Sequence, residues 1–427
     1  MKKFAPLLLS LLAMVFVSAC VGGTTTIDPN NGLKINEFSA DRAIVEQTDL
    51  VSFFADIQNV GGTTASCVRA QLLNVDSWRT TTGDTLSLQG ISDFNAIGFS
   101  SSGSFFGNLC IGKNFCVSVA KGAGGLSLSG FIGNIFSDLS KEAICNKNLF
   151  KNDAKLQQVF KFQEELAPPD KERNRPGQSF TADWTLVPPV LPEGLRTEFH
   201  PAVRVTYVYK TTASITIPVM TKNEYESRIN LGKPVDATFK VEHPLGGAPI
   251  KVAVTRATSP IIVNTDPVAI SQNPIERATY IIELQNVGNG IPTPAEFTGA
   301  PGQTGKQGGF VLGAVTLSGS GVQFDDCLGN GVSAALNRGQ IASPVFVTPS
   351  VFTTGNQQLL LGGNSEILRL RSDKKAPFGC TLAIDRQAWT SRPFGEILMT
   401  FDLYYLYNVD KETTITVKGV EGNTPTF

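Results

Sequence analysis

The chain has 427 residues, of which 17% are charged, and its formal net charge is −1. A near-neutral chain has no basic field to attract nucleic acid or anionic lipid, which argues against nucleic acid as a partner. The length suits two domains better than one. Because 41 glycines and 24 prolines accompany few long apolar helical patterns, the composition favours an all-β protein with many turns.

The first twenty residues have the features of a lipoprotein signal peptide. Lys2 and Lys3 precede the apolar run "FAPLLLSLLAMVFV", which at about 14 residues is shorter than the roughly 20 that span a bilayer. The following "Val17-Ser18-Ala19-Cys20" resembles the lipobox of prokaryotic lipoproteins. The resemblance implies cleavage before Cys20 and lipidation of its sulfur. The alternative is an ordinary secretory signal with a chance cysteine.

Residues 21–32, "VGGTTTIDPNNG", are small and polar and predict a flexible tether between the lipid and the folded part. Two acyl chains on Cys20 would hold firmly, since each buried CH₂ contributes roughly 0.8 kcal/mol. We therefore expect an exported protein that is lipid-anchored outside the cytoplasmic membrane, at the cell surface or in the periplasm.

Six further cysteines make an even number, which in an exported chain predicts disulfides: Cys67, Cys110, Cys116, Cys145, Cys327 and Cys380. The simplest bridge in the second half is Cys327–Cys380. The four in the first half allow three pairings, of which we favour Cys110–Cys116 with Cys67–Cys145. A zinc site is not predicted, because no CxxC occurs, and we expect no metal or cofactor.

A phrase of nine residues is written once in each half of the chain, "FADIQNVGG" at Phe54–Gly62 and "IIELQNVGN" at Ile281–Asn289. Apolar residues alternate with polar ones in both copies, so one row is expected in a core and the row with the carboxylates towards water. Asn bonds its own turn and Gly reaches positive φ without strain, so both strands are predicted to end in a tight turn.

The match between the halves continues beyond this phrase. "ADWTL" around Trp184 is matched with "QAWTS" around Trp389, and "VTYVYKTTASITIPV" with "LYYLYNVDKETTITVKG". The openings "LKINEF" and "IKVAV" are also alike. A duplicated module of short alternating strands predicts two antiparallel, immunoglobulin-like β-sandwiches. One tryptophan per repeat suits a core position, and the alternative is an exposed tryptophan that meets a ligand.

These motifs resemble the Ig-like modules of prokaryotic surface proteins, including the CARDB-type adhesion modules and domains of archaeal envelope proteins. The resemblance implies tandem sandwiches with a surface role and carries over no catalytic residue. We expect this order along the chain: signal peptide 1–20, tether 21–32, first module 33–222 with an insertion at 84–165 that includes short helices, connector strand 223–249, second module 250–420 and tail 421–427.

The insertion is rich in Gly, Ser and Phe, and it contains more aromatic residues than a loop usually exposes. Its candidate partner patch comprises Phe99, Phe105, Phe106, Phe115, Phe131 and Phe136. Such residues either cover an open edge of the first sandwich or form a docking surface for a partner.

Catalytic groups are scarce in the sequence. It has no nucleophile elbow, P-loop or HExxH motif, and its two histidines, His200 and His243, each precede a proline, which favours extended backbone and a structural role. Asp325 and Asp326 beside Cys327 predict a charged turn rather than a calcium site, which needs six or more oxygens. We expect no enzyme.

The leading functional hypothesis is a structural or protein-binding component of a prokaryotic envelope, whose partner besides the membrane is an envelope protein or a polysaccharide. A carbohydrate-binding or adhesion module is the alternative, and an accessory domain of an extracellular enzyme is a third. A sugar binder should expose Trp78, Trp184 and Trp389 together. An enzyme should bring two acids, or an acid and His200, together in a cleft.

Overall fold

The computed structural model describes residues 27–86, 97–100, 108–111, 115–118, 158–233, 235, 239–256, 259–292, 294–297, 306–327, 357–361, 369–370 and 374–420. These residues form mainly antiparallel strands in several sheets, and the two α-helices among them are short. The all-β prediction is therefore confirmed. Within the expected insertion, the described residues 158 and 159 are helical, and the segment around residues 135–145 lies outside the described residues.

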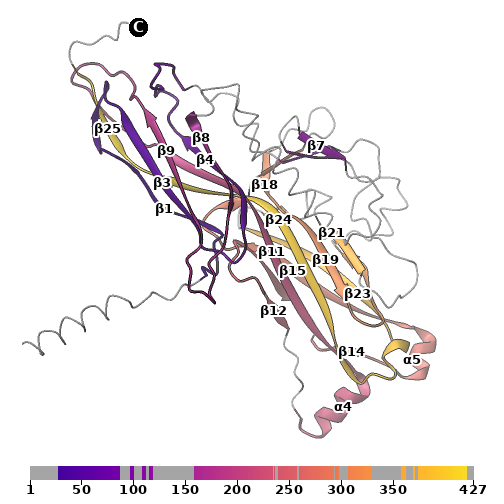
Figure 1. Ribbon diagram of the computed structural model, residues 1–427. Coiled ribbons are helices and arrows are strands. Elements are labelled where there is room, and N and C mark those ends of the chain that lie inside the picture. Colours follow the sequence, from indigo (N-terminus) through magenta and orange to yellow (C-terminus); the bar gives the residue numbers. More distant parts are fainter. Residues whose placement is uncertain are drawn as a thin grey trace, which may run out of the picture.

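A ribbon of two long antiparallel strands, β11 (Ala202–Thr221) and β24 (Phe394–Glu412), forms the axis of the molecule. Their register is continuous from Ala202 opposite Glu412 to Met220 opposite Phe394. At about 3.3 Å per residue, a 20-residue strand extends about 66 Å. Figure 1 shows the ribbon running through both halves of the molecule.

Further strands extend the ribbon into a central sheet. Near the start of β11 the neighbours are β4 (Ala65–Leu73) and then β8 (Phe160–Leu166). Beside the start of β24 lie β19 (Leu312–Ser318) and then β21 (Gln357–Leu361). Three short strands complete the described part of this sheet: β12 (Lys240–Glu242), β14 (Ile261–Val263) and β16 (Ile291–Pro292).

Two cover sheets pack on the central sheet, one over each half. The first contains β1 (Leu33–Ala40), β3 (Val51–Asn59) and β9 (Ser179–Leu186). The second contains β13 (Ile250–Arg256), β15 (Ile275–Asn286), β23 (Lys375–Asp385) and β20 (Val322–Cys327). Their apolar rows share one core cluster with the central sheet, so each half is a two-sheet sandwich.

The repeated phrase occupies equivalent places in the two sandwiches. It lies in β3 and β15, whose neighbours β1 and β13 place Leu33 opposite Asn59 and Ile250 opposite Asn286. The alternation is observed as predicted, because the apolar row is buried in both strands. Glu283 is the exception: it is also buried and its carboxylate pairs with Lys375 Nζ at 3.0 Å.

The sandwiches do not follow each other along the chain as the predicted boundaries at 222 and 250 require. The second half of β11 belongs to the second sandwich, where β12 and β14 pair with it. The last strand, β25 (Ile415–Lys418), pairs with β10 (Arg196–Phe199) and β2 (Ile44–Glu46) of the first sandwich. Each sandwich therefore contains chain from both repeats, because the two-residue alternation of both long strands continues across the junction.

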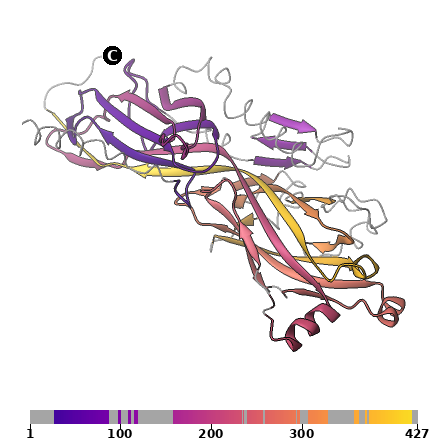
Figure 2. The ribbon, with the colours of Figure 1, turned by 60° about the horizontal axis from the view of Figure 1, so that its bottom comes forward.

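The insertion also differs from its predicted extent. Its last part, β8, is a strand of the central sheet. Upstream of it, β5 (Ile97–Ser100) pairs in parallel with β17 (Pro294–Phe297) of the second repeat. With β6 (Asn108–Ile111), β7 (Phe115–Ser118), β18 (Lys306–Phe310) and β22 (Arg369–Leu370), they form a separate insertion sheet that draws on both repeats. Figure 2 shows β5, β6 and β7 in purple beside the sandwiches.

The connector between the repeats contains a helix that was not predicted, α4 (Lys222–Asn230). It has no buried residue, so its sequence has no apolar stripe to reveal it. The hydroxyl of Thr221 caps its N-terminus, and Arg228 pairs with Glu224 at 2.7 Å. After it, β12 provides the strand expected in the connector. A shorter helix, α5 (Pro267–Gln272), lies in the second repeat. Within the described ranges, no helix is long and apolar enough to cross a membrane.

Candidate functional site at the junction of the sandwiches

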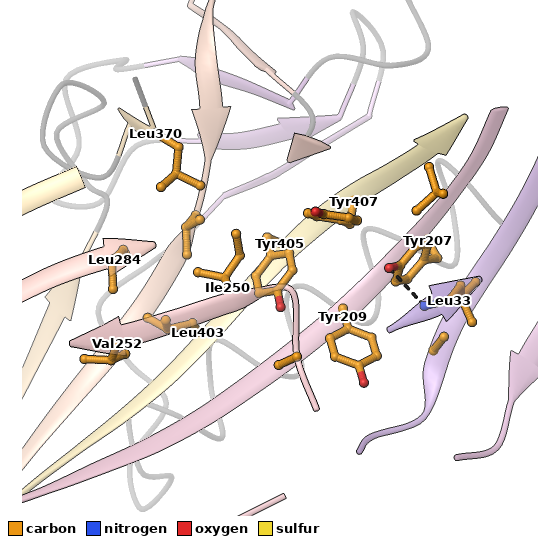
Figure 3. Packing of buried hydrophobic residues seen from close by; sticks show 14 of the residues in the cluster. Leu33, Tyr207, Tyr209, Ile250, Val252, Leu284, Leu370, Leu403, Tyr405 and Tyr407 are labelled. Atoms are coloured by element: carbon orange, nitrogen blue, oxygen red, sulfur yellow. Dashed lines mark hydrogen bonds between the residues drawn. The ribbon is translucent and has the colours of Figure 1, made fainter. Parts of the chain in front are cut away.

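Four tyrosines lie together where the ribbon passes from one sandwich to the other. Tyr207 is opposite Tyr407 and Tyr209 is opposite Tyr405 in the ribbon. Their ring centroids are 5.8 and 6.2 Å apart, and all four residues are at most 1% exposed. Figure 3 shows these junction tyrosines among buried residues of both sandwiches. The Tyr-x-Tyr motifs of the two repeats thus meet in one cluster.

The first Asn-Val-Gly turn is fastened to one of these tyrosines. Tyr209 Oη accepts a hydrogen bond from the backbone N–H of Thr63 at 3.2 Å and donates one to Gly247 O at 3.1 Å. Within the turn, Asn59 Oδ1 accepts from Gly61 N at 3.0 Å, and Asn59 Nδ2 donates to Thr63 O at 2.9 Å. The predicted side-chain closure of the turn by Asn is therefore observed.

The second turn repeats this arrangement on Tyr407. Its Oη accepts from Gly290 N at 3.1 Å and donates to Asn286 Oδ1 at 2.7 Å. Asn286 Oδ1 also accepts from Gly288 N at 3.2 Å, and Asn286 Nδ2 donates to Gly290 O at 2.9 Å. Each copy of the repeated phrase therefore ends in a turn that binds the second tyrosine of its own repeat's Tyr-x-Tyr motif.

The glycines of the two turns are needed for close approach and not for positive φ. Neither Gly61 nor Gly288 has a left-handed backbone, which corrects the expectation from the sequence. A Cβ at Gly288 would lie 2.5 Å from Tyr407 Oη and 2.6 Å from Pro249 Cβ. A Cβ at Gly61 would collide with Tyr209 Oη in the same way. The glycines leave room for the phenol groups that hold the turns.

Residues 27–32 fill the seam between the two turns. On the first sandwich, Asp28 N donates to Val60 O at 2.8 Å, and Leu33 N, next along the chain, donates to Tyr207 Oη at 3.1 Å (Figure 3). On the second, Asn31 Oδ1 accepts from Asn289 N at 3.1 Å. This segment was predicted as the end of a flexible tether, but it is hydrogen-bonded into both halves.

The hydroxyl groups of the junction tyrosines have a structural role rather than a catalytic one. Burial is the largest cause that raises the pKa of Tyr207 and Tyr405 well above the ordinary value, and it also raises the pKa of Tyr407. The phenols are therefore neutral at physiological pH. Each hydroxyl is engaged by a backbone or side-chain partner, which for Tyr405 is Thr211 Oγ1 at 2.7 Å. Because they are neutral, buried and hydrogen-bonded, these groups hold chain segments in place and are poorly suited to act as acids or bases.

The three tryptophans are all in the core. Trp78, Trp184 and Trp389 are 0%, 2% and 2% exposed. Trp78 packs edge-on against Phe53 at 5.3 Å between ring centroids, and Trp184 Nε1 donates to Val159 O at 2.9 Å. The alternative in which exposed tryptophans form a sugar-binding platform is therefore wrong.

Trp184 and Trp389 are not equivalent, although their sequence contexts are alike. Trp184 lies in β9 opposite Phe53. In the second sandwich the corresponding pair is Cys380 of β23 opposite Tyr280. Trp389 comes later, in a single 3-10 turn at Gln387–Trp389. In the second sandwich, the buried tryptophan thus comes from the turn that follows β23 and not from the strand itself.

Cys67 and Cys380 are each disulfide-bonded. In the strand register Cys327 is opposite Cys380, and Cys110 is opposite Cys116. The pairings Cys327–Cys380, Cys110–Cys116 and Cys67–Cys145 stay predictions. Cys20 and Cys145 lie outside the described residues.

Two of the six phenylalanines of the candidate patch fall in described strands. Phe99 is in β5, opposite Phe297 of β17, and Phe115 is in β7, opposite Ile111 of β6. Phe105, Phe106, Phe131 and Phe136 lie outside the described residues. At the level of the backbone, β5 covers an edge of β17. Both interpretations of these phenylalanines, as an edge cover and as a docking surface for a partner, stay predictions.

The remaining candidate groups are dispersed. His200 Nδ1 meets Glu412 Oε1 at 3.1 Å, and both side chains are more than half exposed. His243 Nε2 accepts from Val252 N at 3.3 Å, and burial lowers its pKa. Asp325 pairs with Arg277 at 2.6 Å. Among the described residues, no three His, Cys, Asp or Glu side chains gather as metal ligands would.

No family model matches the sequence, and no curated protein matches it either. Among solved structures, the Enterococcus faecalis MSCRAMM ACE, which binds its ligands by the collagen Hug model, is 8% identical, with 92% of this chain and 98% of that chain covered and a TM-score of 0.18. The collagen adhesin CNA from S. aureus is 7% identical, with 93% and 96% covered and a TM-score of 0.11. Similarity at this level does not bear on function.

Proposed function

We propose that the protein is a non-catalytic, lipid-anchored component of a prokaryotic cell envelope that serves as a rigid structural or protein-binding body. The observation that carries the proposal is the locked junction: one continuous ribbon runs through both sandwiches, and the four junction tyrosines hold both repeated turns against it.

Rigidity follows from the number of connections that cross the junction. Domains joined by a single exposed linker usually move relative to each other. Here both long strands cross, and residues 27–32 are hydrogen-bonded to both turns. Bending at this point would break ladder hydrogen bonds between β11 and β24 and expose buried phenols, each of which costs free energy. Such a body suits a spacer or a docking platform, which must hold a fixed shape.

The lipid anchor rests on the sequence Val17-Ser18-Ala19-Cys20 after a short apolar run. Two acyl chains on Cys20 would give stable attachment, where one chain gives only marginal attachment. Because the three tryptophans are buried, a protein partner in the envelope is favoured over a polysaccharide that stacks on aromatic rings.

Detergent phase partition of the full chain tests the anchor. The wild-type protein is expected in the detergent phase and the Cys20→Ser variant in the aqueous phase, with the N-terminal peptide of the mature wild type carrying acyl mass on Cys20. A wild-type protein that stays aqueous, or an unmodified peptide that still contains residues 1–20, would refute the anchor.

Rigidity is tested separately by small-angle scattering of the Cys20→Ser variant. We expect the scattering curve of a single extended shape rather than that of an ensemble of hinge angles.

A further inference from the structure

Ile27, seven residues after Cys20, lies at the middle of the molecule and not at a tip. The first described residue is Ile27, which packs beside Gly246 in the seam, and the next residue, Asp28, is bonded to Val60. The seam lies over the junction tyrosines, whose pairs flank the Val208–Leu406 pair of the ribbon. The N-terminal attachment point is therefore close to the centre of the long axis.

The covalent distance from the lipid to this point is short. Seven residue steps separate Cys20 from Ile27, and at 3.3–3.6 Å per residue they reach at most about 25 Å.

Each arm of the body is longer than this reach. From Val208 to Thr221, the end of β11, there are 13 residue steps, or about 43 Å of strand. Towards the other tip, the chain continues from Leu406 through β24 and β25 to Lys418, which is at most about 40 Å. Figure 1 shows the ribbon and β25 extending to opposite ends of the molecule.

We infer that the protein lies along the lipid surface, with the seam towards the membrane and its long axis tilted no further than the tether permits, instead of standing upright on one sandwich. An arm of about 43 Å that pivots about 25 Å above a surface touches it at a tilt of about 35°. The inference rests on the lipid anchor of the proposed function.

The length of the tether sets this orientation, and charge does not. The formal net charge is −1, so no general attraction pulls the body onto anionic lipid. The seam is on the face of the ribbon that carries the tyrosine hydroxyls and the two cover sheets, since Leu33 and both turns bind those hydroxyls. The opposite face of the ribbon is turned away from the lipid.

Energy transfer from the two tips to acceptor lipids tests the orientation. A donor dye is placed through an encoded azide at the exposed Glu226 of α4, or at the exposed Glu193 beside the end of β25, in the full lipidated chain on neutral phosphatidylcholine vesicles. We expect strong and similar transfer from both sites, unchanged by high salt. An upright body would give strong transfer from one tip and baseline transfer from the other, which would be about 80 Å away.

Two variants separate the causes of failure. Insertion of about 14 Gly and Ser residues after Gly23 adds up to about 50 Å of reach, so transfer from both sites should fall if the short tether holds the body down. Unequal transfer in the wild type, or transfer that the insertion leaves unchanged, overturns the inference while the anchor stands. Wild-type protein that binds vesicles no better than Cys20→Ser overturns the anchor and with it the inference.

Discussion

The substitution Gly288→Ala tests whether the repeated turn is built around a phenol. The added Cβ would lie 2.5 Å from Tyr407 Oη and 2.6 Å from Pro249 Cβ, where ordinary van der Waals contact begins at 3.4 Å. The turn must shift to relieve the contact with the proline, which is fixed in the backbone, and Tyr407 must move by about 1 Å to relieve the other contact. That shift breaks the hydrogen bonds of its hydroxyl to Gly290 N and Asn286 Oδ1.

The expected loss of stability combines two effects. Leaving buried polar groups without partners costs about 1–3 kcal/mol, and overpacking adds about 1–3 kcal/mol. We expect Gly288→Ala to lower the free energy of unfolding by about 3–5 kcal/mol. Tyr407→Phe removes the nearest clashing atom at a cost of about 1–3 kcal/mol by itself. In the double variant, the alanine should therefore cost about 1–2 kcal/mol less than in the wild type.

Urea unfolding followed by circular dichroism measures all four proteins of this cycle. Gly379→Ala is the matched control, because the nearest atom to its Cβ would be Tyr280 O at 4.0 Å, and it should change stability by less than about 1 kcal/mol. A loss below about 1 kcal/mol for Gly288→Ala, or a cycle that is additive within about 0.5 kcal/mol, would refute the role assigned to the phenol.

Three further predictions follow from the junction. Tyr209→Phe should destabilise the protein by about 1–3 kcal/mol in urea, because it leaves the buried Thr63 N without its partner. It also removes one of the two hydrogen bonds to Gly247 O, which keeps the one from Gly62 N. Tyr225→Phe on the exposed helix α4 should be neutral within about 0.5 kcal/mol; equal effects would contradict this. Folding raises the pKa of the junction tyrosines, so their contribution is complete below the unfolded pKa of about 10 and is lost as pH rises through the higher folded values. Tyrosinate absorbance should therefore appear for these residues together with loss of circular dichroism, and not before it. Finally, the fragment 223–427 should not fold alone, because β24 lacks β11, but should fold when co-expressed with 27–222; dispersed amide spectra of the lone fragment would disprove the shared ribbon.

Part of the junction could be read from the sequence. The order Asn-x-Gly, then Tyr-x-Tyr, occurs once per repeat, and each turn binds the second tyrosine of its own repeat. The contact itself was not predicted, because nothing local to the turn shows that a phenol from more than a hundred residues away fills the space over the glycine. The tryptophan match was misleading for a related reason. Trp184 and Trp389 lie in similar short sequences, but by strand register the residue of the second sandwich that is equivalent to Trp184 is Cys380.

The sequence by itself determined the fold class, the duplication and the buried rows of β3 and β15. These depend on a two-residue alternation and on turn residues, which act within a few positions of the chain. Only the tertiary structure decided that β11 and β24 run through both sandwiches, that β25 returns to the first, and that residues 27–32 close the seam. An alternating strand has the same pattern whichever sheet it joins, so the choice of partner depends on packing between segments that are far apart along the chain.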